Sequence, residues 1–335
     1  MRAAVFTEPG PASVLQIVDR DLPPVGPGEV RVRIVLSAVN PTDTGTRAGR
    51  GVPDGVEPPR VPNQDGAGLV DAVGDGVSGL EPGDRVWVWD AAYGRENGTA
   101  QEYLVLPLRQ VVRLNEDVPF EVGAALGIPA LTAHRCLTVA ADGPARLAPG
   151  ALDGRSVLVA GGAGAVGNAA IQLAKWAGAT VVSTVSSKEK ADLAHAAGAD
   201  VVINYREEDV AARFAELAAP NIVVEVNTDN LSLDLDVIAP GGNIAIYVGG
   251  KFSVPSFKAM LKNVSLDFVL TYTTSTEEKD NAVAAVAEAV NDGVFRVGAE
   301  AGLPIVRFPF EQVAQAHEAV EQHAVGKVVI EVTQP

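Results

Sequence analysis

Residues 156–167 read SVLVAGGAGAVG. An apolar run comes first and a glycine-rich segment follows it. From Val166 onward, apolar residues recur at helical spacing along one face, at Ala169, Ala170, Leu173 and Ala177. The order of these patterns predicts a buried strand, a tight glycine turn and a helix.

The three glycines of the G-x-G-x-x-G pattern are Gly162, Gly164 and Gly167. In such a turn the first permits a tight bend, the second leaves room for a pyrophosphate, and the third lets the helix pack against the strand. The first helical amides, at Ala165 and Val166, then face the anion. An ordinary glycine-rich turn is the alternative, but a second strand at 180–184 favours a dinucleotide site.

The residues after that second strand bear on the choice of cofactor. Chains that bind NAD usually carry Asp or Glu about 20 residues past the fingerprint, to hold the ribose. This chain has Ser186 there, and Ser187, Lys188 and Lys190 follow it. A missing carboxylate and nearby cations favour a 2′-phosphate. The segment therefore predicts NADP(H) rather than NAD(H).

Length and composition limit the other possibilities. The chain has 335 residues, 47% of them hydrophobic, with a mean hydropathy of +0.16, which suits two domains. Its net charge of −16 disfavours nucleic acid and anionic membranes. No apolar stretch approaches the roughly 20 residues of a membrane span. The single cysteine, Cys136, excludes an internal disulfide, and we expect a cytoplasmic protein.

The pattern of apolar residues, glycines and prolines changes near residue 122. Before it, residues 30–36 alternate apolar and charged side chains, and glycines and prolines interrupt short segments, which predicts a mostly antiparallel β domain. After it, helical stretches alternate with buried strands, which predicts a parallel sheet wrapped by helices. The predicted strands are 157–160, 180–184, 201–205, 222–226 and 243–248.

The C-terminal part carries further elements. We expect a strand at 266–270, and then a helix that Ser275 and Glu278 begin as a capping box and Gly293 ends. A short helix at 310–320 and a last strand at 327–332 are predicted to return to the first domain. The strand at 266–270 is a candidate sheet edge, and such edges are normally covered.

Several motifs along the chain resemble those of the zinc-free quinone oxidoreductases, the zeta-crystallin-like branch of the medium-chain dehydrogenase/reductase superfamily. Besides the glycine fingerprint, they are Val39–Asp43, Asp65–Gly68, Gly83–Val86, Ala125–Ala133, Val202–Arg206, Asn230–Ser232 and Ala239–Gly242. The resemblance implies an α/β protein with a GroES-like, β-rich catalytic domain and a doubly wound Rossmann domain. We place the first at 1–122 and 264–335 and the second at 123–263. It also implies a homodimer that pairs the strands at 266–270.

The resemblance also implies roles for single residues. Asn40 and Thr132 would lie near the nicotinamide, with Asn40 positioning it or the substrate, and Val166 would lie against its ring or ribose. Ser186, Lys190 and Tyr205 would surround the 2′-phosphate. Tyr247 and Lys327 fall in segments that approach the cofactor in the family. For Tyr247 a purely structural side chain, and for Lys327 a surface lysine, are the alternatives.

A zinc ion is not expected. In zinc alcohol dehydrogenases of the superfamily a cysteine stands at the position of Asn40 and a His-Glu pair at Gln64 and Asp65. Catalytic zinc needs three protein ligands of N, S or carboxylate type. Only Asp65 qualifies here, and the stretch Leu126–Ile128 has no Cys or His.

The substrate pocket is less clearly marked. Many relatives carry tyrosines after the Asn-x-x-Asp motif, whereas residues 44–51 contain none. Gln64, Trp89 and Tyr93 are the candidates to line the pocket. Because Trp87 and Trp89 alternate on a strand, at least one of them must face a core, and both facing a core is the alternative.

These features together predict an NADPH-dependent, zinc-free reductase of quinones. An enoyl or alkenal reductase that delivers hydride to an α,β-unsaturated carbonyl is the alternative on the same scaffold. A non-catalytic NADPH-binding protein is a second alternative, which the missing pocket tyrosines keep open. The expected partners are small molecules and a second copy of the chain.

Overall fold

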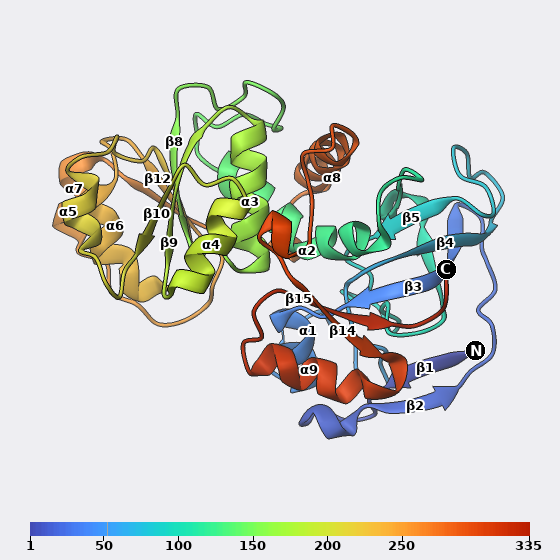
Figure 1. Cartoon of the computed structure of the whole chain (residues 1–335). Helices are drawn as coiled ribbons and strands as arrows, with labels where there is room; N and C mark the ends of the chain where they lie inside the picture. The colour runs from blue at the N-terminus through green and yellow to red at the C-terminus, as the bar shows by residue number, and fades with distance from the viewer. Residues whose placement is uncertain (52) are drawn as a thin grey trace. The chain divides into compact units, whose positions relative to one another are not determined.

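The computed structural model describes residues 1–51 and 53–335 and divides into two compact units. Met1–Ile128 and Ile305–Pro335 form the first unit, and Pro129–Pro304 forms the second (Figure 1). Both ends of the chain therefore belong to one unit, as predicted.

A parallel sheet forms the centre of the second unit. Its six strands follow the order β10-β9-β8-β11-β12-β13, so the order reverses between β8 and β11, where open α/β sheets bind ligands. The strands are β8 (Ser156–Ala160), β9 (Thr180–Val185), β10 (Val201–Asn204), β11 (Ile222–Glu225), β12 (Asn243–Ile246) and β13 (Ser265–Phe268). All residues of β8, β11 and β12 are buried. The five strands predicted after residue 122 are confirmed.

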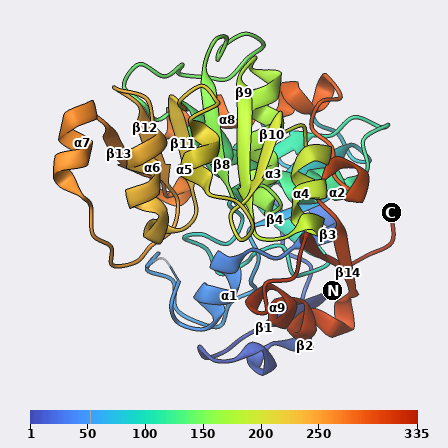
Figure 2. The ribbon, with the colours of Figure 1, turned by 60° about the vertical axis from the view of Figure 1, so that its left-hand side comes forward.

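Helices cover both faces of this sheet. In Figure 1, α3 and α4 lie on one side of it and α5, α6 and α7 on the other, which confirms the doubly wound arrangement. The helices are α3 (Ala165–Trp176), α4 (Lys188–Ala196), α5 (Val210–Phe214), α6 (Leu231–Val237), α7 (Ser256–Lys262) and α8 (Thr276–Asn291), with 3-10 turns at Thr228–Asn230, Thr271–Thr273 and Ala299–Ala301. Figure 2 shows α7 and β13 together at one edge of the sheet.

The structure assigns residues 264–304 to the second unit, whereas the sequence analysis placed them in the first domain. β13 pairs in parallel with β12 and extends the sheet of the second unit, and α8 also belongs to that unit. The predicted capping box begins α8, because the Glu278 amide donates to Ser275 Oγ at 3.2 Å and the Ser275 amide to Glu278 Oε2 at 2.8 Å. The chain returns to the first unit at 305 rather than 264, because strand pairing with β12 holds the intervening segment.

The first unit is β-rich and mostly antiparallel. Its main sheet has the order β14-β15-β3-β4-β5-β7, with β6 paired to β3, and β1 pairs separately with β2. The elements are β1 (Arg2–Val5), β2 (Gln16–Asp19), β3 (Glu29–Ala38), α1 (Pro41–Arg47), β4 (Asp65–Val73), β5 (Arg85–Val88), β6 (Tyr103–Pro107), β7 (Val111–Arg113), β14 (Ile305–Pro309), α9 (Val313–Glu321) and β15 (Lys327–Glu331), with 3-10 turns at Ala12–Val14, Leu108–Gln110 and Phe310–Gln312.

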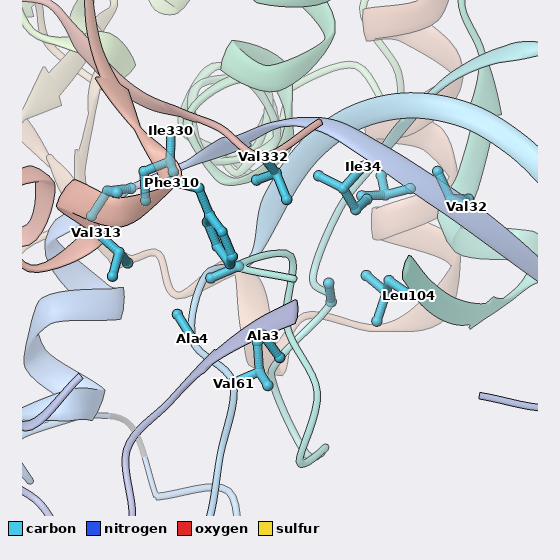
Figure 3. Close-up of a cluster of buried hydrophobic side chains, with 14 of the residues drawn as sticks. Ala3, Ala4, Val32, Ile34, Val61, Leu104, Phe310, Val313, Ile330 and Val332 are labelled. Atoms are coloured by element: carbon cyan, nitrogen blue, oxygen red, sulfur yellow. The ribbon is translucent and has the colours of Figure 1, made fainter. Parts of the chain in front are cut away.

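One core joins the two ends of the chain. β15 pairs antiparallel with β3, with Val329 opposite Ala38. Phe310 and Ile330 from the C-terminal segment pack with Ala4 and Ile34 from the N-terminal segment (Figure 3). Burying large apolar side chains contributes about 1.5–3 kcal/mol each, so this shared core holds the C-terminal strands in the first unit.

The helix α2 (Phe120–Thr138) contains the boundary between the units. Its regular geometry breaks at Gly127, where φ is −1° and ψ is −119°, and Pro129 follows two residues later. Within the residues described, no helix is both long and apolar enough to cross a membrane.

Candidate functional site

The glycine turn joins the end of β8 to the start of α3. A Cβ atom at Gly162 would lie 2.1 Å from Ser183 Oγ, and one at Gly167 would lie 2.3 Å from the Gly161 carbonyl oxygen. Neither position has room for a side chain. Gly164, in contrast, is exposed and is the N-cap of α3, and its Cβ would meet only the Gly161 oxygen, at 3.4 Å. Two glycines therefore serve close packing, and one leaves bare backbone facing outward.

Three predicted ribose contacts meet at the carboxyl ends of β9 and β10. These strands are neighbours, with Asn204 opposite Val185, so Ser186 and Tyr205 leave the sheet side by side. Lys190 Nζ donates to Ser186 Oγ at 3.2 Å, and Tyr205 is 53% exposed. Among the described residues, Lys190 has no carboxylate partner. The group offers a cation, a hydroxyl and an exposed aromatic ring, which fits a phosphorylated ribose.

The other predicted cofactor residues of the second unit have local partners. Ser187 is the N-cap of α4, and its Oγ accepts from the Lys190 amide at 3.3 Å. Thr132 shares a 2.7 Å hydrogen bond with the hydroxyl of Thr271. Tyr247 is half-buried, its amide donates to the Glu225 carbonyl at 3.2 Å, and burial raises the pKa of its phenol. Their roles in cofactor binding stay predictions. Ala165 and Val166 begin α3 and are both half-buried.

A pair of buried carboxyl groups lies at the end of β11, and sequence reasoning missed it. Glu225 ends the strand and Asp234 lies on α6, and the two side chains are hydrogen-bonded, which requires a shared proton. Burial and the neighbouring Glu225 raise the pKa of Asp234 to about 9. The sequence did indicate a buried carboxyl group here, because Asp234 falls between Leu231 and Leu235 on the apolar face of α6.

This pair predicts an alkaline loss of stability. The folded state holds the proton of Asp234 more tightly than the unfolded chain does, so stability falls as the pH rises from the ordinary carboxyl range toward about 9. We expect Asp234→Asn to reduce the fall in melting temperature between pH 5 and pH 9. Asp192→Asn, at an exposed position of α4, is the control and should follow the wild-type profile. An unchanged profile in Asp234→Asn would contradict the shared proton.

In the first unit, a buried cluster forms around Asn40. Lys327 Nζ donates to Asn40 Oδ1 at 2.6 Å, and Asn40 Nδ2 donates to Asp65 Oδ2 at 2.7 Å. The Ile128 amide donates to the other oxygen of Asp65 at 2.9 Å. Lys327 is 2% exposed, so the alternative of a surface lysine is wrong. The predicted residues Asn40 and Lys327 are therefore in direct contact, with Asp65 completing the cluster.

Burial dominates the electrostatics of this cluster. It raises the pKa of Asp65 and lowers that of Lys327, while the attraction between the two charges, 3.7 Å apart, opposes both shifts. The Asp43 side chain accepts a hydrogen bond at Oδ2 from the backbone N–H of Asn40, at 2.7 Å. Burial and the nearby Asp65 raise the pKa of Asp43 to about 7. A lysine ammonium thus stands among carboxyl groups in a site closed to water.

The predicted pocket residues differ in their surroundings. Gln64 Oε1 accepts from the amides of Ala92 and Tyr93, at 2.9 and 3.0 Å, so it holds the segment that carries Tyr93. Trp87 and Trp89 are each 1% exposed, which agrees with the alternative that both face a core. The guanidinium of Arg109 lies 5.3 Å from the centre of the Trp89 ring. Gln64 and Tyr93 are thus in contact, and Trp89 is buried in the first unit.

The residues of the buried cluster do not fit a zinc site. Asp65 is the only carboxylate, imidazole or thiolate among Asn40, Gln64 and Asp65, and both of its oxygens already accept hydrogen bonds. The Lys327 ammonium lies 3.7 Å from Asp65 Oδ2 and would repel a divalent cation. Across residues 1–51 and 53–335, no group of three or more His, Cys, Asp or Glu side chains is arranged to hold a metal ion.

Two domain families match the chain. They are the alcohol dehydrogenase GroES-like domain over residues 26–116 and the zinc-binding dehydrogenase domain over residues 165–288. Over 98% of its length the chain is 32% identical to a quinone oxidoreductase of Lama guanicoe, of which it covers 97%. Over 98% it is also 29% identical to an NADPH-dependent alkenal/one oxidoreductase of Arabidopsis thaliana, of which it covers 79%.

Solved structures show the same likeness. The quinone oxidoreductase of Escherichia coli in complex with NADPH superposes with a TM-score of 0.78 at 26% identity, over 99% of this chain and 100% of that one. An NAD-dependent alcohol dehydrogenase superposes with a TM-score of 0.85 at 29% identity, over 99% and 100%. The fold is therefore shared by oxidoreductases that differ in cofactor and substrate.

Proposed function

Because the chain belongs to the quinone oxidoreductase family of the medium-chain dehydrogenase/reductase superfamily, we propose that it is an NADPH-dependent reductase of quinones. The observation that carries this proposal is the meeting of Ser186, Lys190 and Tyr205 beside the glycine turn, in a chain that matches quinone oxidoreductases over nearly its whole length. Gly164 would admit the pyrophosphate, and Lys190 would bind the 2′-phosphate.

The chemistry of a quinone suits a site without a metal. NADPH, when bound, supplies a hydride from its nicotinamide C4. Hydride transfer to a quinone gives a hydroquinone anion whose charge spreads over the ring, and one proton then completes the hydroquinone. The protein has to orient the acceptor and exclude water, and no Lewis acid has to stabilise a localised alkoxide.

Reduction of α,β-unsaturated carbonyls is the second candidate, and the similarity to an alkenal/one oxidoreductase supports it. A panel of quinones and a panel of enones, assayed for NADPH oxidation with a chelator in every buffer, tests the proposal. We expect higher kcat/KM values for the quinones. Higher values for the enones would establish the alternative, and tight NADPH binding without oxidation by any acceptor would establish a non-catalytic protein.

Zinc independence is part of the proposal. Its support is the Lys327 ammonium, which already supplies the positive charge beside Asp65. Turnover that fell in the presence of the chelator and returned on addition of Zn²⁺ would contradict it.

The preference for NADP(H) predicts a selective effect at Lys190. We expect Lys190→Ala to weaken NADPH binding about 10-fold, because a hydrogen bond to a charged group contributes about 1.5 kcal/mol or more. NADH lacks the 2′-phosphate, so its dissociation constant should not change. Lys251→Ala, at an exposed position, is the matched control. Equal weakening of both nucleotides, measured by fluorescence titration, would place Lys190 outside the phosphate site.

We also propose that the chain forms a homodimer through the edge of its parallel sheet. β13 ends the strand order, and its outer edge pairs with no strand among the described residues. Beside it lie four large apolar side chains that are 61–69% exposed, namely Phe257, Met260, Leu261 and Phe268. An unpaired edge and an apolar surface together fit a second copy of the same chain.

Sedimentation tests this dimer. We expect the wild-type chain to sediment as a dimer and the variant Phe268→Glu/Leu261→Lys as a monomer, because charges would have to be buried at the interface. Val18→Glu, at an exposed position of β2 in the first unit, is the control and should remain dimeric. A wild-type chain that is monomeric at micromolar concentration would overturn the proposal.

A further inference from the structure

The buried carboxyl group of Glu225 orders the loop of residues 226–230, which joins β11 to α6. Glu225 Oε1 accepts from the Asn227 amide at 2.5 Å and from Asn230 Nδ2 at 3.1 Å. The Asn230 amide in turn donates to the Asn227 carbonyl at 3.0 Å, around the 3-10 turn Thr228–Asn230. One carboxyl oxygen therefore holds both ends of this turn.

The other oxygen of Glu225 faces α6. Glu225 Oε2 and Asp234 Oδ2 are buried and have no N–H partner among the described residues, and the two side chains are hydrogen-bonded to each other. Two carboxyl groups can be joined only through an O–H, so one proton lies between these oxygens. Asp234 thereby fixes the rotation of the Glu225 carboxyl group, and Oε1 stays turned toward the loop.

The loop begins beside the glycine turn. β11 and β8 are neighbours with Val224 opposite Val159, so Val226 leaves the sheet opposite Gly161. A Cβ atom at Gly161 would lie only 3.3 Å from Val226 Cγ1. The strand order reverses between β8 and β11, and open α/β sheets bind ligands in the crevice at the carboxyl ends of such strands. The 226–230 loop therefore lies at the crevice where the nucleotide is proposed to bind.

We propose that Asp234 and Glu225 are positioning residues for the nucleotide, and that their hydrogen bond holds the 226–230 loop in the conformation that binds it. The inference rests on the proposed binding of NADPH. The two carboxyl groups are 2% and 1% exposed, so they act through the loop rather than by touching the nucleotide. When the bond is lost, the ordered loop is populated for only part of the time, and the apparent affinity falls by that fraction.

The shared proton couples this arrangement to pH. Burial and the neighbouring Glu225 raise the pKa of Asp234 to about 9. Loss of the proton leaves two carboxylates in contact, and like charges at this distance repel each other. The loop is therefore anchored at neutral pH and loses its anchor as the pH rises through about 9.

The other ionisable groups near the pair do not supply this pH dependence. Tyr247 lies close enough to respond to the charge of Glu225, and Cys136 lies close to Tyr247. Burial raises the pKa of the Tyr247 phenol and of the Cys136 thiol, so both stay neutral. Asp229, the ionisable residue of the loop, is exposed.

The cations of the helices that pack against α6 have partners of their own. Arg213 of α5 pairs with Glu208. Lys258 of α7 pairs with Asp236 at 2.7 Å, and Lys262 Nζ donates to two carbonyls at the end of α6, at 2.8 and 2.7 Å. The pKa shift of Asp234 therefore has only burial and Glu225 as its causes.

Asp234→Leu tests the positioning role at pH 7. Leucine has the same branched shape but no donor, and the net charge does not change because Asp234 holds its proton at this pH. We expect the dissociation constants of NADPH and NADH both to rise about 10-fold, the result of losing about 1.4 kcal/mol. Fluorescence titration below the melting temperature of the variant measures them. Asp236→Leu, at an exposed position of the same helix, is the control and should bind both nucleotides as the wild type does.

Asp234→Asn tests the role of the proton, because its amide can donate to Glu225 at every pH. Between pH 7 and pH 9.5 we expect the NADPH affinity of the wild type to fall about 5-fold more than that of Asp234→Asn, the lower end of common coupling effects. Lys190 and the 2′-phosphate are the same in both titrations, so their own protonation cancels. This comparison also decides the proposal if Asp234→Leu does not fold.

Wild-type nucleotide affinity in a folded Asp234→Leu protein would overturn the positioning role and leave a purely structural pair. Weakening of NADPH alone would also overturn it, because the loop lies at the glycine turn and not at the 2′-phosphate. Identical pH profiles for the wild type and Asp234→Asn would do the same. A wild-type chain that binds neither nucleotide would instead refute the proposed function, so the two failures are distinguishable.

Discussion

Replacing Lys327 with Met should lower the free energy of unfolding by about 3–5 kcal/mol, the usual result of removing one partner from a buried ion pair. Met approximates the volume of the lysine stem, so the packing of β15 changes little. The loss arises because Asp65 would remain buried at 0% exposure without a compensating cation. Urea unfolding at pH 7 measures it.

Lys251→Met is the matched control, because it removes a lysine from an exposed position of the second unit. Its unfolding curve should coincide with that of the wild type. A Lys327→Met variant that unfolds with the control would mean that Asp65 carries no charge in the folded protein, and the ion pair would then have no part in stability.

We expect substitutions at Gly167 and Gly164, two positions of the glycine turn, to have different effects on stability. Gly167→Val should destabilise the second unit by about 3 kcal/mol, at the upper end of the cost of overpacking, and should abolish measurable NADPH binding. The atoms that its Cβ would approach within 3 Å all belong to the backbone of Gly161 and Gly162, so no side-chain movement relieves the contact. Thermal unfolding and NADPH titration measure the two effects.

Gly164→Ala provides the contrast. Its φ of −84° is accessible to alanine and its Cβ meets only one atom, at 3.4 Å, so the melting temperature should stay near that of the wild type. NADPH binding should nevertheless weaken, because the methyl group would stand where the pyrophosphate approaches the backbone. Unchanged NADPH affinity in Gly164→Ala would show that the nucleotide does not bind at this turn.

Local patterns predicted the elements that depend on neighbours along the chain. The glycine turn, the capping box of Ser275 and Glu278 and the buried strands of the parallel sheet all involve residues a few positions apart, and the structure confirms them. The segment 264–304 was assigned to the wrong unit, because its place depends on the pairing of β13 with β12. The residues of a short apolar strand do not indicate which sheet the strand joins.

The sequence by itself therefore determined the α/β architecture, the glycine turn between β8 and α3, and the serine, lysine and tyrosine that follow β9 and β10, since each depends on short-range geometry. Only the tertiary structure decided the environment of Lys327, which lies 287 residues from Asn40 along the chain. The antiparallel pairing of β15 with β3 brings the two together, and burial then gives an ordinary lysine its partners and its altered pKa. The carboxyl pair of Glu225 and Asp234 has the same origin, because both depend on which side chains the fold removes from water.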